Sequence, residues 1–239
     1  MSWLAVRSRW SGRKLIAILA IAMYGVMTVA TQVESLFFLR DKMPVSLILR
    51  LFVQGAITTA LFVPALVALT GKLRRPQGLI TVSSVPLPSS ALLKRLAISV
   101  VLFIFLYMFF GYFVAWRNPA LRQFYGGVDT PNFFIAVKNS WQTRPGIYLL
   151  QVFRGTLYFA CVLPLVRMLR APKWEAVLTI SAFLSVWSLV LLLPNPILPR
   201  TVALSHFWET LICFLIFGAA LGWMLSDSQR PASLAKTVS

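Results

Sequence analysis

Long runs of apolar residues without a charge constrain this chain more than any other feature. Residues 16–33 (IAILAIAMYGVMTVATQV) and 97–116 (AISVVLFIFLYMFFGYFVAW) contain no charged side chain. A bilayer has a hydrocarbon core about 30 Å thick, which takes about 20 apolar residues of helix to cross. Hydrophobic residues make up 59% of the chain, against roughly 45–50% in soluble domains. The sequence therefore predicts an all-α, polytopic membrane protein, with residues 1–239 forming one integral membrane domain.

The apolar pattern predicts six transmembrane helices. The first run is too long for the apolar part of a cleavable signal peptide, and no small-residue cleavage site follows it. An even number of spans places both termini on the same side of the membrane. The predicted spans are 15–38, 45–69, 93–116, 146–169, 174–193 and 202–225.

The distribution of basic residues predicts the orientation of these spans. The net charge of +17 comes from 23 Lys and Arg residues against 6 Asp and Glu residues. In a soluble protein this excess points to nucleic acid, but in a membrane protein it first reports topology. Fourteen basic residues fall on the side of the termini and seven on the other side. Because cytoplasmic loops are rich in Lys and Arg, we expect both termini inside, in a bacterial-type inner membrane. The inner basic clusters then meet anionic lipid head groups, and no nucleic acid partner is expected.

The longest connection, residues 117–146, is expected to contain a short amphipathic helix near 131–141. Thr130 is a suitable cap and Pro131 a suitable first residue for this helix. An apolar side suits a helix that lies in the outer membrane interface. It serves either as a lid or as a loop that rests on an apolar surface. The apolar side consists of Phe133, Phe134, Val137 and Trp141.

A few polar residues lie within the predicted spans, where such residues are costly and usually face the bundle interior. At 1.5 Å per residue, most of them lie roughly 6–14 Å below the outer ends of their helices. They therefore form one polar layer in the outer-leaflet half of the bundle. The residues of this layer, which are our candidate ligand-binding residues, are Glu34, Arg50, Gln54, Gln151, Arg154, His206 and Glu209.

The spacing within each helix predicts that the layer converges on one centre. Residues three or four apart share a helix face, as Gln151 and Arg154 do, and as His206 and Glu209 do. We therefore expect Arg50, Arg154, His206 and Glu209 to point into the bundle, with at least one Arg–Glu contact within about 4 Å. We expect Glu209 to pair with Arg154 or Arg50.

Three functions remain open for this layer. The first is binding of a small anionic or zwitterionic amphiphile, either alone or together with its movement or processing, because arginine holds phosphate or carboxylate groups by paired hydrogen bonds. The second is a metal-free membrane hydrolase or transferase with His206 and Glu209 as catalytic acid and base. The third is a structural ion-pair network in a subunit of a larger membrane complex. Gly218 and Gly222 form a GxxxG motif that suits close packing against another helix, either of this chain or of a membrane protein partner.

The sequence gives no sign of a metal or a cofactor. It contains one histidine and lacks HExxH, CxxC and GxSxG motifs and nucleotide-binding glycine loops. His206, Glu209 and Glu34 are the three residues that would have to supply a metal site, and three mixed ligands without a spacing motif are a weak signal. Cys161 and Cys213 lie in apolar runs and are expected to pack as small apolar residues. Whether the protein is an enzyme stays open at this point.

Overall fold

A computed structural model describes residues 1–74 and 88–226 of this chain. It confirms the all-α class and the six spans. The described residues contain six helices that are long and apolar enough to cross a membrane, at Gly12–Phe38, Val45–Leu69, Ser89–Ala115, Gly146–Met168, Lys173–Leu192 and Arg200–Ser226. Each end lies within a few residues of its predicted position. Three of the basic residues used to predict the orientation, Arg75, Arg230 and Lys236, lie outside the described residues.

Three of the six spans are not α-helical throughout. The first consists of α2 (Gly12–Met23), the π-helix η1 (Tyr24–Val29) and α3 (Ala30–Phe38). The third consists of α5 (Ser89–Phe110) and the π-helix η2 (Gly111–Ala115). The fifth consists of α9 (Lys173–Ser185) and the 3-10 helix η3 (Val186–Leu192). Short π-helical segments within α-helices often occur at functional sites, and η2 adjoins the polar cluster described below.

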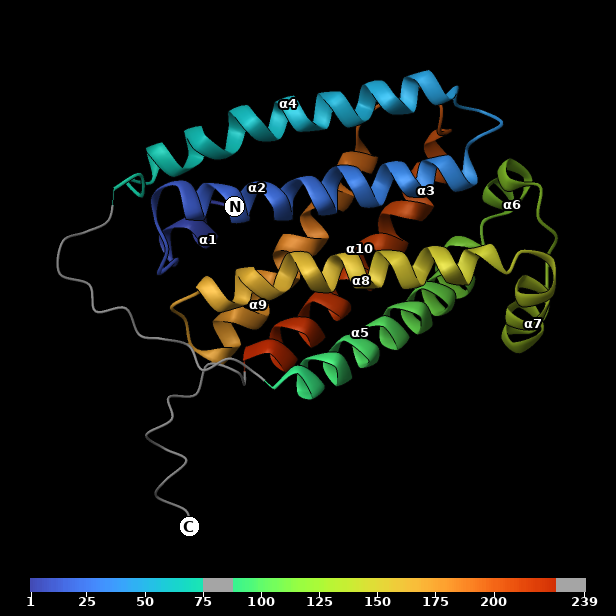
Figure 1. The fold of residues 1–239 in the computed structure, drawn as a ribbon. Coiled ribbons are helices and arrows are strands. Elements are labelled where there is room, and N and C mark those ends of the chain that lie inside the picture. The colour runs from blue at the N-terminus through green and yellow to red at the C-terminus, as the bar shows by residue number, and fades with distance from the viewer. Residues whose placement is uncertain (75–87, 227–239) are drawn as a thin grey trace, which may run out of the picture.

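The other three spans are continuous α-helices: α4 (Val45–Leu69), α8 (Gly146–Met168) and α10 (Arg200–Ser226). The most buried span is α8, whereas α4 and α5 are the least buried. Figure 1 shows α4 at the edge of the bundle, alongside the α2–α3 span. The core therefore forms around α8, and α4 and α5 have the most surface available to lipid.

The N-terminal residues are attached to one end of the bundle. The short helix α1 (Ser2–Val6) buries Leu4 and Ala5. Beyond it, the backbone of Arg9 donates a hydrogen bond to the carbonyl of Met168 at 2.8 Å, and Gly12 donates to Lys72 at 2.8 Å. The chain start therefore holds together the ends of α8 and α4.

The opposite end of the bundle carries two short helices, α6 (Pro119–Tyr125) and α7 (Phe133–Thr143), in the long connection between α5 and α8 (Figure 1). We call it the α6/α7 end. The N-cap of α7 is Asn132, whose side chain accepts a hydrogen bond from the backbone of Phe134 at 2.8 Å. The prediction that Thr130 caps this helix and that Pro131 begins it was wrong, because the amide of Asn132 satisfies the first free backbone donors instead.

Only part of the apolar side predicted for α7 packs against the bundle. The ring of Phe133 packs against the rings of Tyr112 and Phe113 in η2, with centroids 5.6 and 5.5 Å apart. Phe134 and Trp141 remain exposed. Their exposure is compatible with an interfacial position, which stays a prediction.

The GxxxG motif of α10 is used inside the chain. A Cβ atom added at Gly218 would lie 2.6 Å from the Cα of Ser181, and one added at Gly222 would lie 2.7 Å from the Cα of Val177. These glycines therefore allow α10 and α9 to approach backbone to backbone. The close helix packing predicted for Gly218 and Gly222 therefore occurs within the chain, against α9.

Candidate functional site

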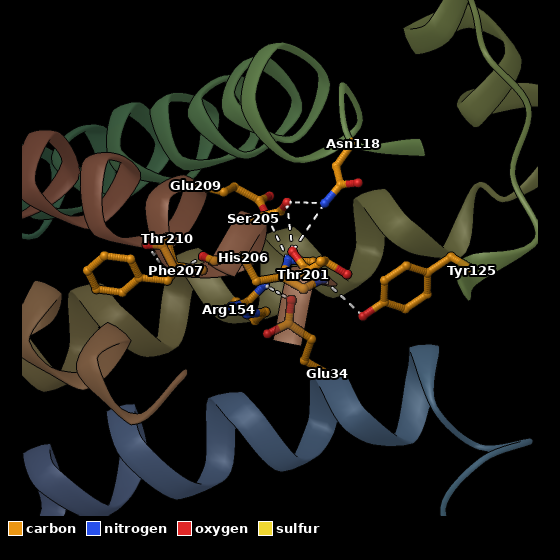
Figure 2. Close-up of polar contacts among 10 residues, drawn as sticks. All are labelled: Glu34, Asn118, Tyr125, Arg154, Thr201, Ser205, His206, Phe207, Glu209 and Thr210. Carbon is orange, nitrogen blue, oxygen red and sulfur yellow. Dashed lines mark hydrogen bonds and ion pairs between the residues drawn. The ribbon is translucent and has the colours of Figure 1, made fainter. Parts of the chain in front are cut away.

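A cluster of polar side chains from α3, α6, α8 and α10 meets between these helices (Figure 2), and Arg154 comes from α8. The Arg154 side chain is 5% exposed. Its Nη1 atom donates to Oε1 of Glu34 on α3 at 2.8 Å. This contact confirms the prediction of an Arg–Glu pair within about 4 Å, and it joins the first and fourth spans.

Two other residues of α8 accept hydrogen bonds from Arg154. Nη1 also donates to Oε1 of Gln151 at 3.1 Å, and Nη2 donates to the hydroxyl of Tyr158 at 3.2 Å. These residues are three positions before and four positions after Arg154, so all three share one helix face. The guanidinium group also lies 5.5 Å from the ring centroid of Phe103 on α5, within the range of a cation–π contact.

The hydrogen bonding of this group is incomplete. Nε of Arg154 and Nε2 of Gln151 are buried donors that have no acceptor. An unsatisfied polar group in a low-dielectric interior costs about 1–3 kcal/mol, and more when it is charged. Nearly all buried polar groups in native proteins have a partner, so these two donors require an acceptor such as a ligand oxygen or a water molecule.

A second set of contacts runs through His206 on α10. Its Nδ1 atom lies 2.8 Å from Oε2 of Glu209, and its Nε2 atom lies 3.0 Å from the hydroxyl of Tyr125 on α6. An ionised carboxylate only accepts hydrogen bonds, so the proton between His206 and Glu209 belongs on Nδ1. In the neutral imidazole, Nε2 is then free to accept the proton of the Tyr125 hydroxyl. Glu209, His206 and Tyr125 form a hydrogen-bonded chain.

Tyr125 is held in place by the local structure of α6. Asn118 caps this helix through a hydrogen bond from the backbone of Ala120 at 3.0 Å, and Gly126 ends it with a φ of 66°, a conformation that favours glycine. Burial, followed by the negative charges of Glu34 and Glu209, raises the pKa of Tyr125 well above its ordinary value. Tyr125 is therefore a protonated donor at physiological pH, and both carboxylates lie within electrostatic range of it.

The two sets form one electrostatic cluster. Glu34 of the first set and Glu209 of the second both act electrostatically on the Tyr125 hydroxyl. At Gly111, the first residue of η2, an added Cβ would lie 3.4 Å from Oε1 of Glu209. The start of the π-helix therefore passes directly beside the carboxylate of the second set.

Two of the predicted residues do not join this cluster. Arg50 and Gln54 lie on the exposed face of α4, so the prediction that Arg50 points into the bundle was wrong. The opposite face of α4 is fixed by Gly55, where an added Cβ would clash with Thr28. Because this close approach sets the rotation of α4, the polar side chains on its other faces turn away from the bundle.

The predicted partner of Glu209 was also wrong. We expected Arg154 or Arg50 to pair with it, but Glu209 contacts His206, while Arg154 pairs with Glu34. The sequence pattern places these residues at one depth, but it does not show whether Glu34 or Glu209 pairs with Arg154. It also missed Tyr125, which lies outside the spans in the segment FYGG. No periodicity links that segment to His206.

Within residues 1–74 and 88–226, no three His, Cys, Asp or Glu side chains are grouped so that they could hold a metal ion. Glu34, which we had considered with His206 and Glu209 as a metal ligand, pairs with Arg154 instead. Cys161 and Cys213 are both buried and free.

No protein-family model matches this chain, and neither a curated protein nor a solved structure is significantly similar to it. The class of the protein therefore follows from its own fold. It is a multi-pass α-helical membrane protein with a buried ionic cluster formed by four of its six spans and one connecting helix.

Proposed function

We propose that this protein binds a small amphiphile with an anionic or zwitterionic head group at Arg154 and the residues bonded to it. These residues, which we call the Arg154 cluster, are Glu34, Gln151, Arg154 and Tyr158. The observation that carries this proposal is the pair of buried donors without acceptors, Nε of Arg154 and Nε2 of Gln151. A phosphate or carboxylate oxygen is the strongest acceptor for an arginine N–H group. A head-group oxygen that reaches either donor would satisfy it.

Glu34 supports a head group that also carries a positive charge. Its side chain is 32% exposed, whereas that of Arg154 is 5% exposed. Glu34 is thus the more accessible member of the pair, and its carboxylate suits an ammonium group. A zwitterionic head group then meets a cation and an anion of the protein in matched positions. The acyl part of the ligand remains in the surrounding lipid.

The proposed setting follows from the charge distribution. With both termini in the cytoplasm of a bacterial-type inner membrane, the α6/α7 end faces outward and the ligand enters from the outer leaflet. The basic residues at the other end, such as Arg13 and Lys14, then contact anionic lipid head groups. Lipids are the only partners that this proposal requires.

Mass spectrometry of the purified protein tests the binding proposal. The wild type should retain a specific amphiphile with an anionic or zwitterionic head group through detergent extraction. The Gln151→Leu variant should retain about tenfold less, and the double variant Glu34→Gln/Arg154→Gln should retain none. Arg7→Gln is the matched control because it removes an arginine of another ion pair, and it should retain the wild-type amount. Equal retention by all variants, or an empty wild type, would contradict the proposal and leave the cluster as a structural ion-pair network.

A second function is favoured by the chain of Glu209, His206 and Tyr125. Glu209 holds Nδ1 of His206, and Nε2 accepts a hydrogen bond from a hydroxyl group. This is the arrangement in which histidine takes a proton from an attacking hydroxyl group or water. In a metal-free hydrolase or transferase, the substrate hydroxyl or water would take the place of the Tyr125 hydroxyl. Neither function needs a cofactor.

Turnover of the retained amphiphile distinguishes the enzyme from the binding protein. The wild type is incubated in vesicles with the amphiphile identified above, and products are followed by mass. A catalytic role predicts that His206→Gln abolishes product formation while retaining the amphiphile. Absence of product from the wild type, or equal product from His206→Gln, would contradict catalysis and leave the binding proposal standing.

A further inference from the structure

The exposed face of α4 differs from that of α5, which is buried to the same small extent. From residue 97 to residue 110, the exposed side chains of α5 are all apolar: Ala97, Ile98, Val101 and Phe105. Such a face is fully satisfied by lipid tails. The exposed face of α4 instead carries Arg50 and Gln54. Lipid tails offer no hydrogen bonds to these groups.

The depth of Gln54 makes its exposure costly. At 1.5 Å per residue it lies about 14 Å beyond Val45, the first residue of α4. The hydrocarbon core is only about 30 Å thick, so the amide lies well inside it. Among the described spans, no other exposed amide or charged side chain lies as far from the end of its helix. The short side chain of Gln54 cannot reach the head groups from this depth, so it needs a hydrogen-bonding partner within the membrane.

The neighbours of Gln54 form a seam suited to a second helix. Left-handed helix pairs are held together by residues that recur every three or four positions. Ile57 is 56% exposed and Leu61 is 70% exposed. They continue the line of Gln54 toward the other end of α4. The exposed residues of α4 that recur at spacings of four, three and four are Arg50, Gln54, Ile57 and Leu61.

We propose that this face of α4 is the interface of a parallel, two-fold symmetric dimer, in which the Gln54 side chains of two copies hydrogen-bond to each other. Copies inserted with the same topology share a symmetry axis along the membrane normal, so identical residues meet at identical depths. A primary amide has both donors and an acceptor. Gln54 is therefore self-complementary on such an axis, and side-chain hydrogen bonds between membrane helices stabilise association.

Arg50 sets a limit on the strength of this dimer. It lies one turn closer to the start of α4 than Gln54, so two Arg50 residues also approach each other across the axis. The long side chain of arginine extends toward the head groups, where phosphates screen the repulsion. Because the two Arg50 residues repel each other, charge does not hold the two copies together, and Gln54 supplies the specificity of the dimer.

Cysteine cross-linking in vesicles tests the interface. In a background lacking Cys161 and Cys213, an Ile57→Cys variant should form a disulfide-linked dimer on mild oxidation. The control Val101→Cys is 67% exposed on α5 and should stay monomeric. The interface is wrong if both positions cross-link equally, or if neither does at high protein density.

The role of Gln54 has its own measurement. Energy transfer between labelled copies, followed as lipid dilutes the protein, gives the dissociation constant in the membrane. Gln54→Leu should weaken association by about tenfold, Gln54→Asn should restore part of it, and Arg50→Gln should strengthen it. A Gln54→Leu variant that associates as tightly as the wild type would overturn the proposal. This dimer does not depend on the proposed ligand, because α4 contributes no residue to the Arg154 cluster.

Discussion

Among the residues that the structure describes, two Arg–Glu pairs join distant segments, and they are built differently. At the end of the bundle near the N-terminus, Arg7 meets both oxygens of Glu175, through Nε at 2.7 Å and Nη2 at 3.1 Å. The Arg7 side chain is 44% exposed. Arg154 is 5% exposed, yet it gives only one hydrogen bond to Glu34 and keeps a buried Nε without an acceptor.

Each pair has one buried member, and the hydrogen bonding of that member separates a structural pair from a candidate site. In the Arg7 pair the buried member is Glu175, which is 8% exposed, and both of its carboxylate oxygens accept hydrogen bonds. No bulk water reaches Arg154, so an incomplete pair there carries the full cost of desolvation. A ligand that accepts the remaining hydrogen bond of Arg154 would explain why the protein keeps this desolvation cost.

The largest expected effect concerns which side of the membrane each pair faces. A cysteine at Val128, which is 75% exposed in the connection between α6 and α7, should react completely with a membrane-impermeant reagent added from outside. A cysteine at Arg74, near the other end of the bundle, should not react until the membrane is opened. Val128 is a better probe position than Gly127, where a side chain would clash with Trp116. The reverse labelling pattern would move the Arg154 pair to the inner leaflet.

The next largest effect should come from breaking the buried pair. Glu34→Gln leaves the Arg154 charge without its carboxylate and should lower the free energy of unfolding by about 3–5 kcal/mol. Adding Arg154→Gln removes the isolated charge and should recover much of that loss. Thermal unfolding in one detergent measures both variants. If the double variant is no more stable than Glu34→Gln, the charge is not the source of the cost.

The Arg7 pair should respond less. Arg7→Gln removes two hydrogen bonds from the carboxylate of Glu175, which is only 8% exposed. Glu175 lies in the first turn of α9, where the helix N-terminus also stabilises a carboxylate, so we expect a loss of about 1–2 kcal/mol. The same thermal assay applies. A loss as large as that of Glu34→Gln would show that the two pairs do not differ in the way proposed here.

The sequence was sufficient for some of these features and not for others. The six spans follow from hydrophobic transfer, which acts on each segment separately. The common depth of Glu34 and Arg154 follows from counting residues along helices of known rise. Helix rotation depends on how helices pack against each other. For that reason the sequence analysis wrongly assigned Gln54 to the polar layer inside the bundle. Its neighbour Gly55 marks the face of α4 that packs against Thr28.

The partner of His206 could not be derived by the same means. Tyr125 reaches it from α6, in a connection whose path depends on caps and on the left-handed Gly126. A pattern in the spans carries no information about where that connection lies. Sequence reasoning thus predicted the layer and its depth, whereas the pairings within it required coordinates.

The smallest effect should come from Tyr125→Phe, which removes one hydrogen bond to His206 and should cost about 1 kcal/mol near neutral pH. Its pH dependence is more informative. The pKa of Tyr125 is raised in the folded protein by burial and by Glu34 and Glu209, so above its ordinary value of about 10 the unfolded chain loses this proton first. The stability of the wild type should therefore fall as the pH rises above about 10, and Tyr125→Phe should fall less steeply. Thermal unfolding from pH 8 to 11 measures both slopes, with Tyr148→Phe as the control because Tyr148 bonds only a backbone carbonyl of α7. Equal slopes in the wild type and Tyr125→Phe would mean that neither burial nor the two carboxylates raise the pKa of Tyr125 in the folded protein.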